Sequence, residues 1–164
     1  MSKSRDFKLG NAGEKRVIET FSEFGFECVK NTDKEKLLDY DIFAKDLLKS
    51  VGDFTIEVKN DWYAQKSGNV AIEYFNSNKN THSGVAATKA NIWTHIIGDD
   101  IYAVSVKVLT DYVKKYEPYK ELFDVGDGNA HIYLYRISDI IEDIFTKIDG
   151  LTKRQGRKAL RGML

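Results

Sequence analysis

Residues 53–61 read DFTIEVKND and contain two groups that could do chemistry, Glu57 and Lys59, one residue apart. In a β-strand, successive side chains point to opposite faces. Glu57 and Lys59 therefore share one face of a predicted strand, and the other face is apolar, with Phe54, Ile56 and Val58. The ordinary interpretation is a solvated face whose charges pair across strands. The alternative is a metal-ligating carboxylate beside a catalytic lysine, and this stretch alone leaves both open.

A second acidic position lies on the preceding predicted strand. Asp41 follows Asp39 and leads directly into an apolar run over 42–44. If the two segments are adjacent strands, Asp41 and Glu57 can stand side by side. Two carboxylates at that distance repel unless one is protonated or a cation lies between them, and Mg²⁺ and Mn²⁺ prefer carboxylate oxygens. Such a cation can bind phosphate oxygens and activate water, while Lys59 could steer that water or stabilise charge on phosphorus.

A third carboxylate, Glu14, lies on a predicted helix. The segment 11–25 has helical periodicity and ends at Gly25, a typical stop; its apolar stripe is Val17, Ile18, Phe21 and Phe24. Glu14 falls on that stripe at helical spacing. One explanation is a capping box, in which Asn11 begins the helix and Glu14 reaches back to it. The other is a role beside the two acidic strand positions, and the two roles are compatible.

Composition bounds the class of protein. The chain has 164 residues, 42% hydrophobic and 30% charged, which is typical of one globular domain. It lacks an apolar run long enough to span a membrane and an N-terminal apolar targeting segment, so we expect a cytoplasmic protein without membrane contact. Cys28 is the only cysteine, which excludes an internal disulfide and, with three scattered histidines, argues against a zinc site. The net charge is zero, which argues against indiscriminate nucleic-acid binding.

The order of predicted elements indicates a mixed α/β domain over 1–150. After the first helix, strands are predicted at 26–31, 39–45, 53–59 and 69–75, the first three as antiparallel neighbours. A short helix at 83–93 follows, and then two strands around a Gly-Asp-Asp turn at 94–106. The last predicted elements are a helix at 107–116, a strand at 131–137 and a helix at 138–148 with Ser138 as its N-cap. Residues 151–164 form a predicted basic C-terminal tail, which either solubilises the chain or contacts phosphate.

The acidic set resembles the PD-(D/E)XK nuclease superfamily. The resemblance lies in Glu14 on the first helix, Asp41 on the second strand and Glu57-Val58-Lys59 on the third, and it covers roughly residues 10–105. Residues 68–93 also look like the segment that follows the Glu-x-Lys in many members. The resemblance implies an α/β, restriction-endonuclease-like single domain with an αβββαβ core, in which a central mixed β-sheet is flanked by helices. One departure is Tyr40, which stands where many members have proline.

The resemblance also implies an activity. The family hydrolyses phosphodiester bonds, so we expect a Mg²⁺-dependent endodeoxyribonuclease in which Mn²⁺ can substitute and whose specificity is for junction or repair-type DNA structures. Asp41, Glu57 and the Val58 carbonyl would bind the metal, Lys59 would be catalytic, and Glu14 would be an outer ligand or orienting group. One alternative is a non-catalytic nucleic-acid-binding relative with the same fold. Another is an α/β domain whose acidic strand face is simply solvated.

DNA is the expected partner, and a homodimer is compatible with cutting two strands. Cationic side chains around the predicted site could contact phosphate, although solvated loops explain them equally well. The candidates for nucleic-acid binding are Lys66, Lys89, Lys153, Arg154, Arg157 and Lys158. Glu73 is either a further acid near the metal or a partner of a neighbouring lysine. Trp62, Tyr63 and Trp93 could stack on bases, but such aromatic residues more often belong to a core.

Overall fold

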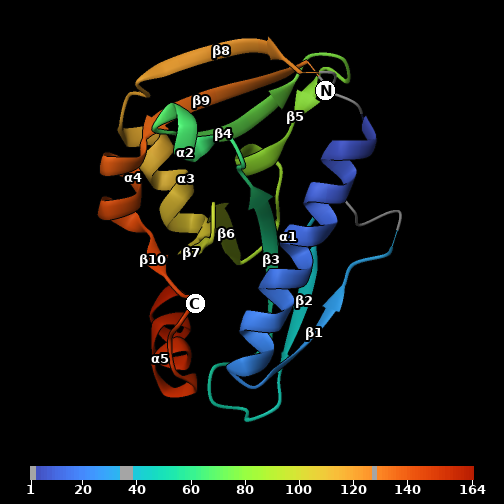
Figure 1. The fold of residues 1–164 in the computed structure, drawn as a ribbon, viewed down its shortest axis with the longest axis vertical. Coiled ribbons are helices and arrows are strands. Elements are labelled where there is room, and N and C mark those ends of the chain that lie inside the picture. The colour runs from blue at the N-terminus through green and yellow to red at the C-terminus, as the bar shows by residue number, and fades with distance from the viewer. Residues whose placement is uncertain (1–2, 34–38, 127–128) are drawn as a thin grey trace.

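The computed structural model describes residues 3–33, 39–126 and 129–164, with side chains from residue 10 onward (Figure 1). The helical elements are α1 (Lys3–Glu23), α2 (Ala64–Ser67), the 3-10 turn η1 (Gly84–Ala86), α3 (Val106–Lys115), α4 (Ile137–Ile144) and α5 (Lys153–Met163). The strands in the first half of the chain are β1 (Phe26–Lys30), β2 (Ile42–Asp46), β3 (Phe54–Asn60), β4 (Asn69–Asn76) and β5 (Thr81–His82). The later strands are β6 (Ile92–Ile97), β7 (Asp100–Ser105), β8 (Lys120–Val125), β9 (Ala130–Arg136) and β10 (Thr146–Lys147). Within the described residues, no helix has the length and apolarity that crossing a membrane would require.

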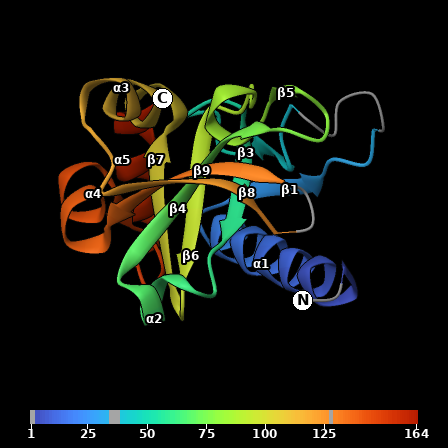
Figure 2. The same ribbon diagram turned by 90° about the horizontal axis from the view of Figure 1, so that it is seen from above.

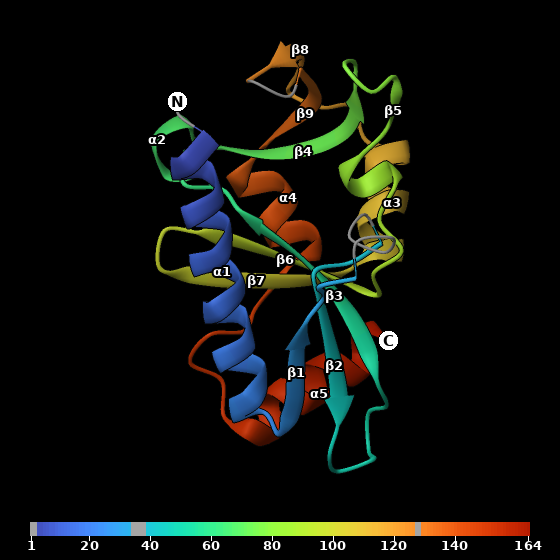
Figure 3. The same ribbon diagram turned by 90° about the vertical axis from the view of Figure 1, so that its right-hand side faces the viewer.

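A mixed sheet with the order β1-β2-β3-β6-β7-β10 forms the centre of the fold (Figures 1 and 3). Neighbouring strands are antiparallel except β3 and β6, which run parallel with Ile56 opposite Ile92. The prediction that the first three strands are antiparallel neighbours is therefore confirmed. α1 packs on one face of this sheet through an aromatic core, in which Phe21 contacts the ring of Phe54 at 5.7 Å between centroids. Burial of such rings stabilises the packing of helix on sheet by roughly 1.5–3 kcal/mol for each side chain.

A smaller sheet, in the order β5-β4-β9-β8, lies across one end of the first, and all of its strand pairs are antiparallel (Figure 1). Trp93 of β6 belongs to a second buried cluster that includes Ile72 of β4, Leu109 of α3 and Ile140 of α4. Figure 2 shows α3 and α4 apart from α1, on the other side of β6 and β7. The predicted α/β class, with a central mixed sheet flanked by helices, is confirmed.

α1 is longer than the sequence pattern predicts, because it begins at Lys3 rather than at residue 11. It ends at Glu23, and Gly25 follows with φ +90°, the left-handed conformation that favours glycine at a helix end. The predicted stop is therefore confirmed. The predicted capping box is wrong, because Asn11 lies inside the helix, where its Oδ1 accepts a hydrogen bond from Lys30 Nζ at 2.6 Å.

The predicted short helix at 83–93 is also wrong, since only the 3-10 turn η1 forms there. The backbone donors of this segment are used elsewhere. Lys89 N donates to the Asp39 carbonyl at 2.8 Å, and Asn91 N donates to the Thr55 carbonyl at 3.0 Å. These bonds hold the segment extended beside β2 and β3 and lead it into β6. In the αβββαβ order, the crossover from β3 to the parallel strand β6 is thus made by α2, β4, β5 and η1 rather than by one long helix.

The last third of the chain differs in detail from the prediction. The strands β6, β7 and β9 and the helix α3 are confirmed. α4 begins at Ile137 with Arg136 as its N-cap residue, so the prediction of Ser138 as N-cap is wrong. α4 ends at Ile144 because the chain then pairs with β7 as β10, Thr146 opposite Ala103. β8 was not predicted, and its mostly exposed side chains give it little periodicity.

The predicted basic tail is a packed helix. α5 begins at Lys153, directly after its N-cap residue Thr152, which forms a capping box with Gln155, and Leu160 is fully buried in the core beneath α1. Arg157 is only 7% exposed, and its Nη2 lies 2.6 Å from Asp46 Oδ1. Asp46 also accepts hydrogen bonds from backbone N–H groups of the β2–β3 turn, including Val51 N at 2.6 Å. These donors and the guanidinium hold the pKa of Asp46 well below its usual range, against the effect of burial.

Candidate active site

The strand register brings Asp41 and Glu57 opposite each other. β2 and β3 are antiparallel with Ile42 opposite Ile56, and Asp41 N donates to the Ile56 carbonyl at 2.9 Å, which extends the pairing by one residue. The side chain of Asp41 turns toward β3, where its Oδ2 accepts a hydrogen bond from Val58 N at 2.7 Å. The predicted juxtaposition of the two carboxylates is therefore present in the fold.

Burial and neighbouring negative charges raise the pKa of both acids. Burial, followed by the charge of Asp41, raises the pKa of Glu57 to about 7. Burial also raises the pKa of Asp41; the hydrogen bond from Val58 opposes this effect and the charge of Glu14 adds to it. The hydroxyl of Thr88 donates to Glu57 Oε2 at 2.9 Å and fixes that carboxylate. Thr88 comes from the segment after η1, which the extended path described above carries alongside β3.

Lys59 follows Glu57 on the same face of β3. Its Nζ lies 3.8 Å from Glu73 Oε2 on β4, and its side chain is 38% exposed. Glu73 is thus the partner of a lysine, one of the two roles considered from the sequence, and it also contributes to the charge around Glu57. The ammonium group is held between the central sheet and the smaller sheet, close to solvent.

Glu14 enters from α1 and is largely buried. Its Oε2 lies 2.5 Å from Nζ of Lys30 at the end of β1. Lys30 is also close enough to lower the pKa of Asp41. It is therefore a cation of the candidate site that the sequence reasoning missed. The available signal was positional, because Lys30 stands at the end of a strand whose neighbour begins just after Asp41.

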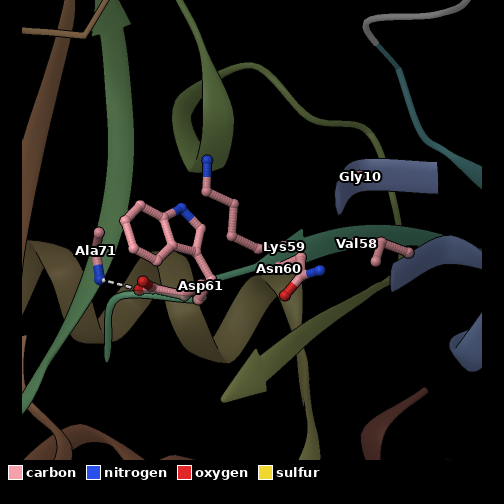
Figure 4. A pocket seen from close by; sticks show the side chains of 7 residues that line it. Gly10, Val58, Lys59, Asn60, Asp61 and Ala71 are labelled. Atoms are coloured by element: carbon pink, nitrogen blue, oxygen red, sulfur yellow. Dashed lines mark hydrogen bonds between the residues drawn. The ribbon is translucent and has the colours of Figure 1, made fainter. Parts of the chain in front are cut away.

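The side chains of Asp41, Glu57, Lys59 and Glu73 form a charged row, and two pockets flank it. One, of about 190 Å³, is lined by Glu57, Glu73 and Thr88 together with residues of β5 and η1. The other, of about 360 Å³, is lined by Lys59, Asp61 and Trp62, with α1 contributing Gly10 (Figure 4). The charged row therefore lies between two openings to solvent, an arrangement that suits a chain-like substrate crossing β3.

The predicted nucleic-acid contacts do not lie together. Lys66 on α2 is exposed, with its Nζ over the Tyr63 ring, and Lys89 is exposed, with its Nζ 3.0 Å from Asp39 Oδ1. α5 lies instead by the β2–β3 turn, at the other end of β3 from Lys59 (Figures 1 and 3). Arg157 is a correction to the prediction, since its buried guanidinium is occupied by Asp46 and cannot reach a phosphate. The other three candidates on α5, Lys153, Arg154 and Lys158, are exposed.

Two carboxylates are the acidic donors that the site offers to a metal. Among residues 10–33, 39–126 and 129–164, no group of three or more His, Cys, Asp or Glu side chains is arranged to hold an ion. This donor set fits Mg²⁺ or Mn²⁺, because such ions are bound through one or two carboxylates and take their other ligands from water and phosphate. It would not suit zinc, which needs three or four protein ligands.

Comparisons with known proteins give little further information. No protein-family model matches the sequence, and no curated protein matches it. A bacterial homing endonuclease, I-Ssp6803I, is similar in structure, with a TM-score of 0.48 and 17% sequence identity over 63% of this chain and 71% of that chain.

Proposed function

We propose that the protein is a divalent-metal-dependent endonuclease that hydrolyses phosphodiester bonds in DNA. The observation that carries the proposal is the pairing of Asp41 with Glu57 across β2 and β3, with Lys59 one step further along the same face. Two partly buried carboxylates with raised pKa values are costly in the protein without a metal, and a bound cation would offset that cost. The resemblance of these residues to the PD-(D/E)XK pattern supports the same activity.

The metal would be held by the free carboxylate oxygens of Asp41 and Glu57, with the Val58 carbonyl as a further ligand. When bound, Mg²⁺ or Mn²⁺ supplies Lewis acidity toward a phosphodiester oxygen. Thr88 orients Glu57, and the Val58 N–H orients Asp41, so both carboxylates are positioned before substrate arrives. This preorganisation matters because phosphoryl chemistry depends mainly on positioning and charge neutralisation.

Lys59 would act on the substrate directly. Its ammonium group is exposed enough to meet a phosphate, and Glu73 limits where it can move. We propose that it stabilises the negative charge that develops on the phosphoryl oxygens, which is stronger in the transition state than in the bound substrate. Glu14 and Lys30 would be positioning residues, since their ion pair fixes charge behind Asp41.

The test is cleavage of plasmid, branched and single-stranded DNA in Mg²⁺, Mn²⁺ or EDTA. Wild-type protein should cut in either metal and not in EDTA, and Lys59→Ala should lose roughly 100-fold or more of the rate. Lys59→Arg should also be slow, because a guanidinium is bulkier and spreads its charge over a plane, whereas the ammonium group is a compact point charge. Lys45→Ala is the matched control, since Lys45 is an exposed lysine on β2.

Circular dichroism would confirm that each variant is folded. A folded Lys59→Ala protein that cuts as fast as wild type, or cleavage that persists in EDTA, would show that the proposal is wrong. DNA binding without cleavage under every metal condition would instead indicate a non-catalytic nucleic-acid-binding relative.

A further inference from the structure

The smaller pocket beside the charged row includes one of the proposed metal ligands. Its volume is about 190 Å³, and Glu57 and Thr88 line one side of it. The other side is formed by the hairpin of β4 and β5, whose turn carries Lys79, and by Ser83 and Gly84 at the start of η1. A substrate group that binds the metal at Glu57 can therefore continue into this pocket.

The wall made by η1 is fixed against β4. Gly84 has φ +51°, the left-handed conformation that favours glycine, and a Cβ added there would collide with the carbonyl oxygen of Glu73. The backbone N–H of Ser83 donates to the Tyr74 carbonyl at 3.1 Å. The close approach of η1 to β4 thus depends on glycine, and it holds Ser83 at a set position beside the pocket.

The hydroxyl group of Ser83 has no partner within the fold. Its Oγ is buried and forms no hydrogen bond with any of the residues that the structure describes. A serine that precedes a helical turn commonly caps it, but the Ser83 side chain makes no capping hydrogen bond to η1. A buried polar atom without a partner is unfavourable. An acceptor oxygen in the pocket would remove that cost, because the unbonded hydroxyl can rotate and donate to it.

The hairpin adds two further donors to the pocket. Lys79 is exposed, and its backbone N–H donates to Asn76 Oδ1 at 3.0 Å, which fixes the turn that carries it. His82 on β5 stands edge-on to the ring of Phe75, with the centroids 6.1 Å apart. The ammonium group of Lys79 and the imidazole of His82 therefore line the pocket from a well-defined hairpin.

The two acids of the pocket lie away from the hairpin turn and have their own cations. Glu73 Oε2 lies 3.8 Å from Lys59 Nζ, and Glu57 would be bound to the metal. Negative charge is thus neutralised at the metal end of the pocket, and hydrogen-bond donors gather at the hairpin end. An anionic group is the ligand that such donors suit.

We infer that this pocket binds a second phosphate of the DNA strand, next to the phosphate that is cleaved, through Lys79, His82 and Ser83. The inference rests on the proposed function and specifies its substrate. Because the pocket shares Glu57 with the metal site, the phosphate within its reach is the next one along the strand. Charge-assisted hydrogen bonds to phosphate oxygens are strong, so a bond at a strand end, without a further phosphate on the pocket side, should be cut poorly.

Replacing one phosphate by a neutral group tests this contact directly. On a DNA substrate whose cut position has been mapped, a single methylphosphonate is placed at each phosphate flanking the cut, and cleavage by the full chain is measured in Mg²⁺. Wild type should lose roughly ten-fold or more of its rate at one position, the phosphate next to the cleaved one on one side. Lys79→Ala should lose a similar factor on unmodified DNA. The same methylphosphonate should then cost this variant little more, because both changes remove one interaction.

Further variants separate ligand binding from folding. Ser83→Ala should slow cleavage several-fold without lowering the free energy of unfolding in urea, because the hydroxyl forms no hydrogen bond with the described residues. His82→Ala should slow cleavage in the same way as Lys79→Ala, and Lys79→Arg should retain most of the rate because the charge is kept. Lys45→Ala is the matched control, since Lys45 is exposed on β2 and does not line the pocket.

Binding gives a readout that does not need catalysis. The affinity for labelled DNA is measured in EDTA by fluorescence anisotropy over a range of salt concentrations. Lys79→Ala should weaken binding and should reduce the slope of log affinity against log salt by roughly one, because one phosphate contact is lost. Lys45→Ala should keep the slope of wild type.

The possible results distinguish the inference from the proposed function. Metal-dependent cleavage in which the losses from Lys79→Ala and from the methylphosphonate multiply would overturn the pocket assignment and leave the nuclease proposal intact. Cleavage that no flanking methylphosphonate slows, or an unchanged salt slope for Lys79→Ala, would do the same. A reduced slope without cleavage in any metal would support phosphate binding in the pocket and reject the catalytic proposal. Failure to bind any DNA would overturn both.

Discussion

In the metal-free protein, Glu57→Gln should increase stability, and the gain should grow with pH. The pKa of Glu57 is about 7 in the fold against an ordinary value of 4.5. The folded state therefore keeps a proton that the unfolded state loses above about pH 4.5. Stability from this group is fully present below pH 4.5 and is lost as pH rises through 7.

The magnitude follows from the same two values. At about 1.4 kcal/mol for each pH unit, the difference between 4.5 and about 7 corresponds to about 3 kcal/mol. Glutamine resembles the protonated acid, so Glu57→Gln and wild type should unfold with similar free energies at pH 4.5. At pH 8 the variant should be more stable by up to about 3 kcal/mol.

The assay is urea unfolding of both proteins in EDTA between pH 4.5 and 8, with Glu27→Gln on the exposed face of β1 as the control. The Glu27→Gln variant should differ little from wild type at either end of the range. A stability gain for Glu57→Gln that is the same at every pH, or a wild-type protein that is more stable at pH 8, would refute the reasoning. Added Mg²⁺ should close the gap at pH 8 by stabilising only the wild type.

Other perturbations test the metal site, Glu14 on α1, and the Arg157–Asp46 ion pair that clamps α5 to the end of β2. Millimolar Mn²⁺ should raise the melting temperature of wild type by several degrees in a thermal scan, and Asp41→Asn should abolish most of that rise. Glu14→Gln loses the ion pair with Lys30 and should slow DNA cleavage several-fold, at a cost of about 1 kcal/mol in urea unfolding; an unchanged rate would remove it from the site. Arg157→Ala leaves Asp46 buried without its cation and should cost about 3–5 kcal/mol by urea unfolding. A loss below about 1 kcal/mol would mean that the pair contributes little.

The parts of the site that depend on local patterns could be predicted from sequence. Apolar alternation in the second and third strands predicts which side chains share a face, and the observed register of Ile42 with Ile56 then places Asp41 beside Glu57. Partners far along the chain could not be predicted. Residues 83–93 look helical, but Asp39 and Thr55 bind their backbone donors and hold them extended.

Charge composition was misleading where a charged group found a buried partner. Five cations within residues 152–162 suggest a solvated tail. Arg157 is nevertheless among the most buried residues of that segment, because its guanidinium forms an ion pair with the buried Asp46. The capping box at Asn11 failed for a related reason. The helix begins earlier, at Lys3, so Asn11 lies inside it and its side chain accepts a hydrogen bond from Lys30 instead of capping the helix.

The clamp between Arg157 and Asp46 has a consequence during synthesis. The two residues are 111 positions apart, so the turn that carries Asp46, and the neighbouring carboxylates and lysine, leave the ribosome long before α5 is made. Until then the buried carboxylate lacks its cation and the core beneath α1 lacks Leu160. A nascent or truncated chain should therefore hold Asp41, Glu57 and Lys59 in an unformed geometry, and the proposed nuclease activity should arise only once α5 has docked.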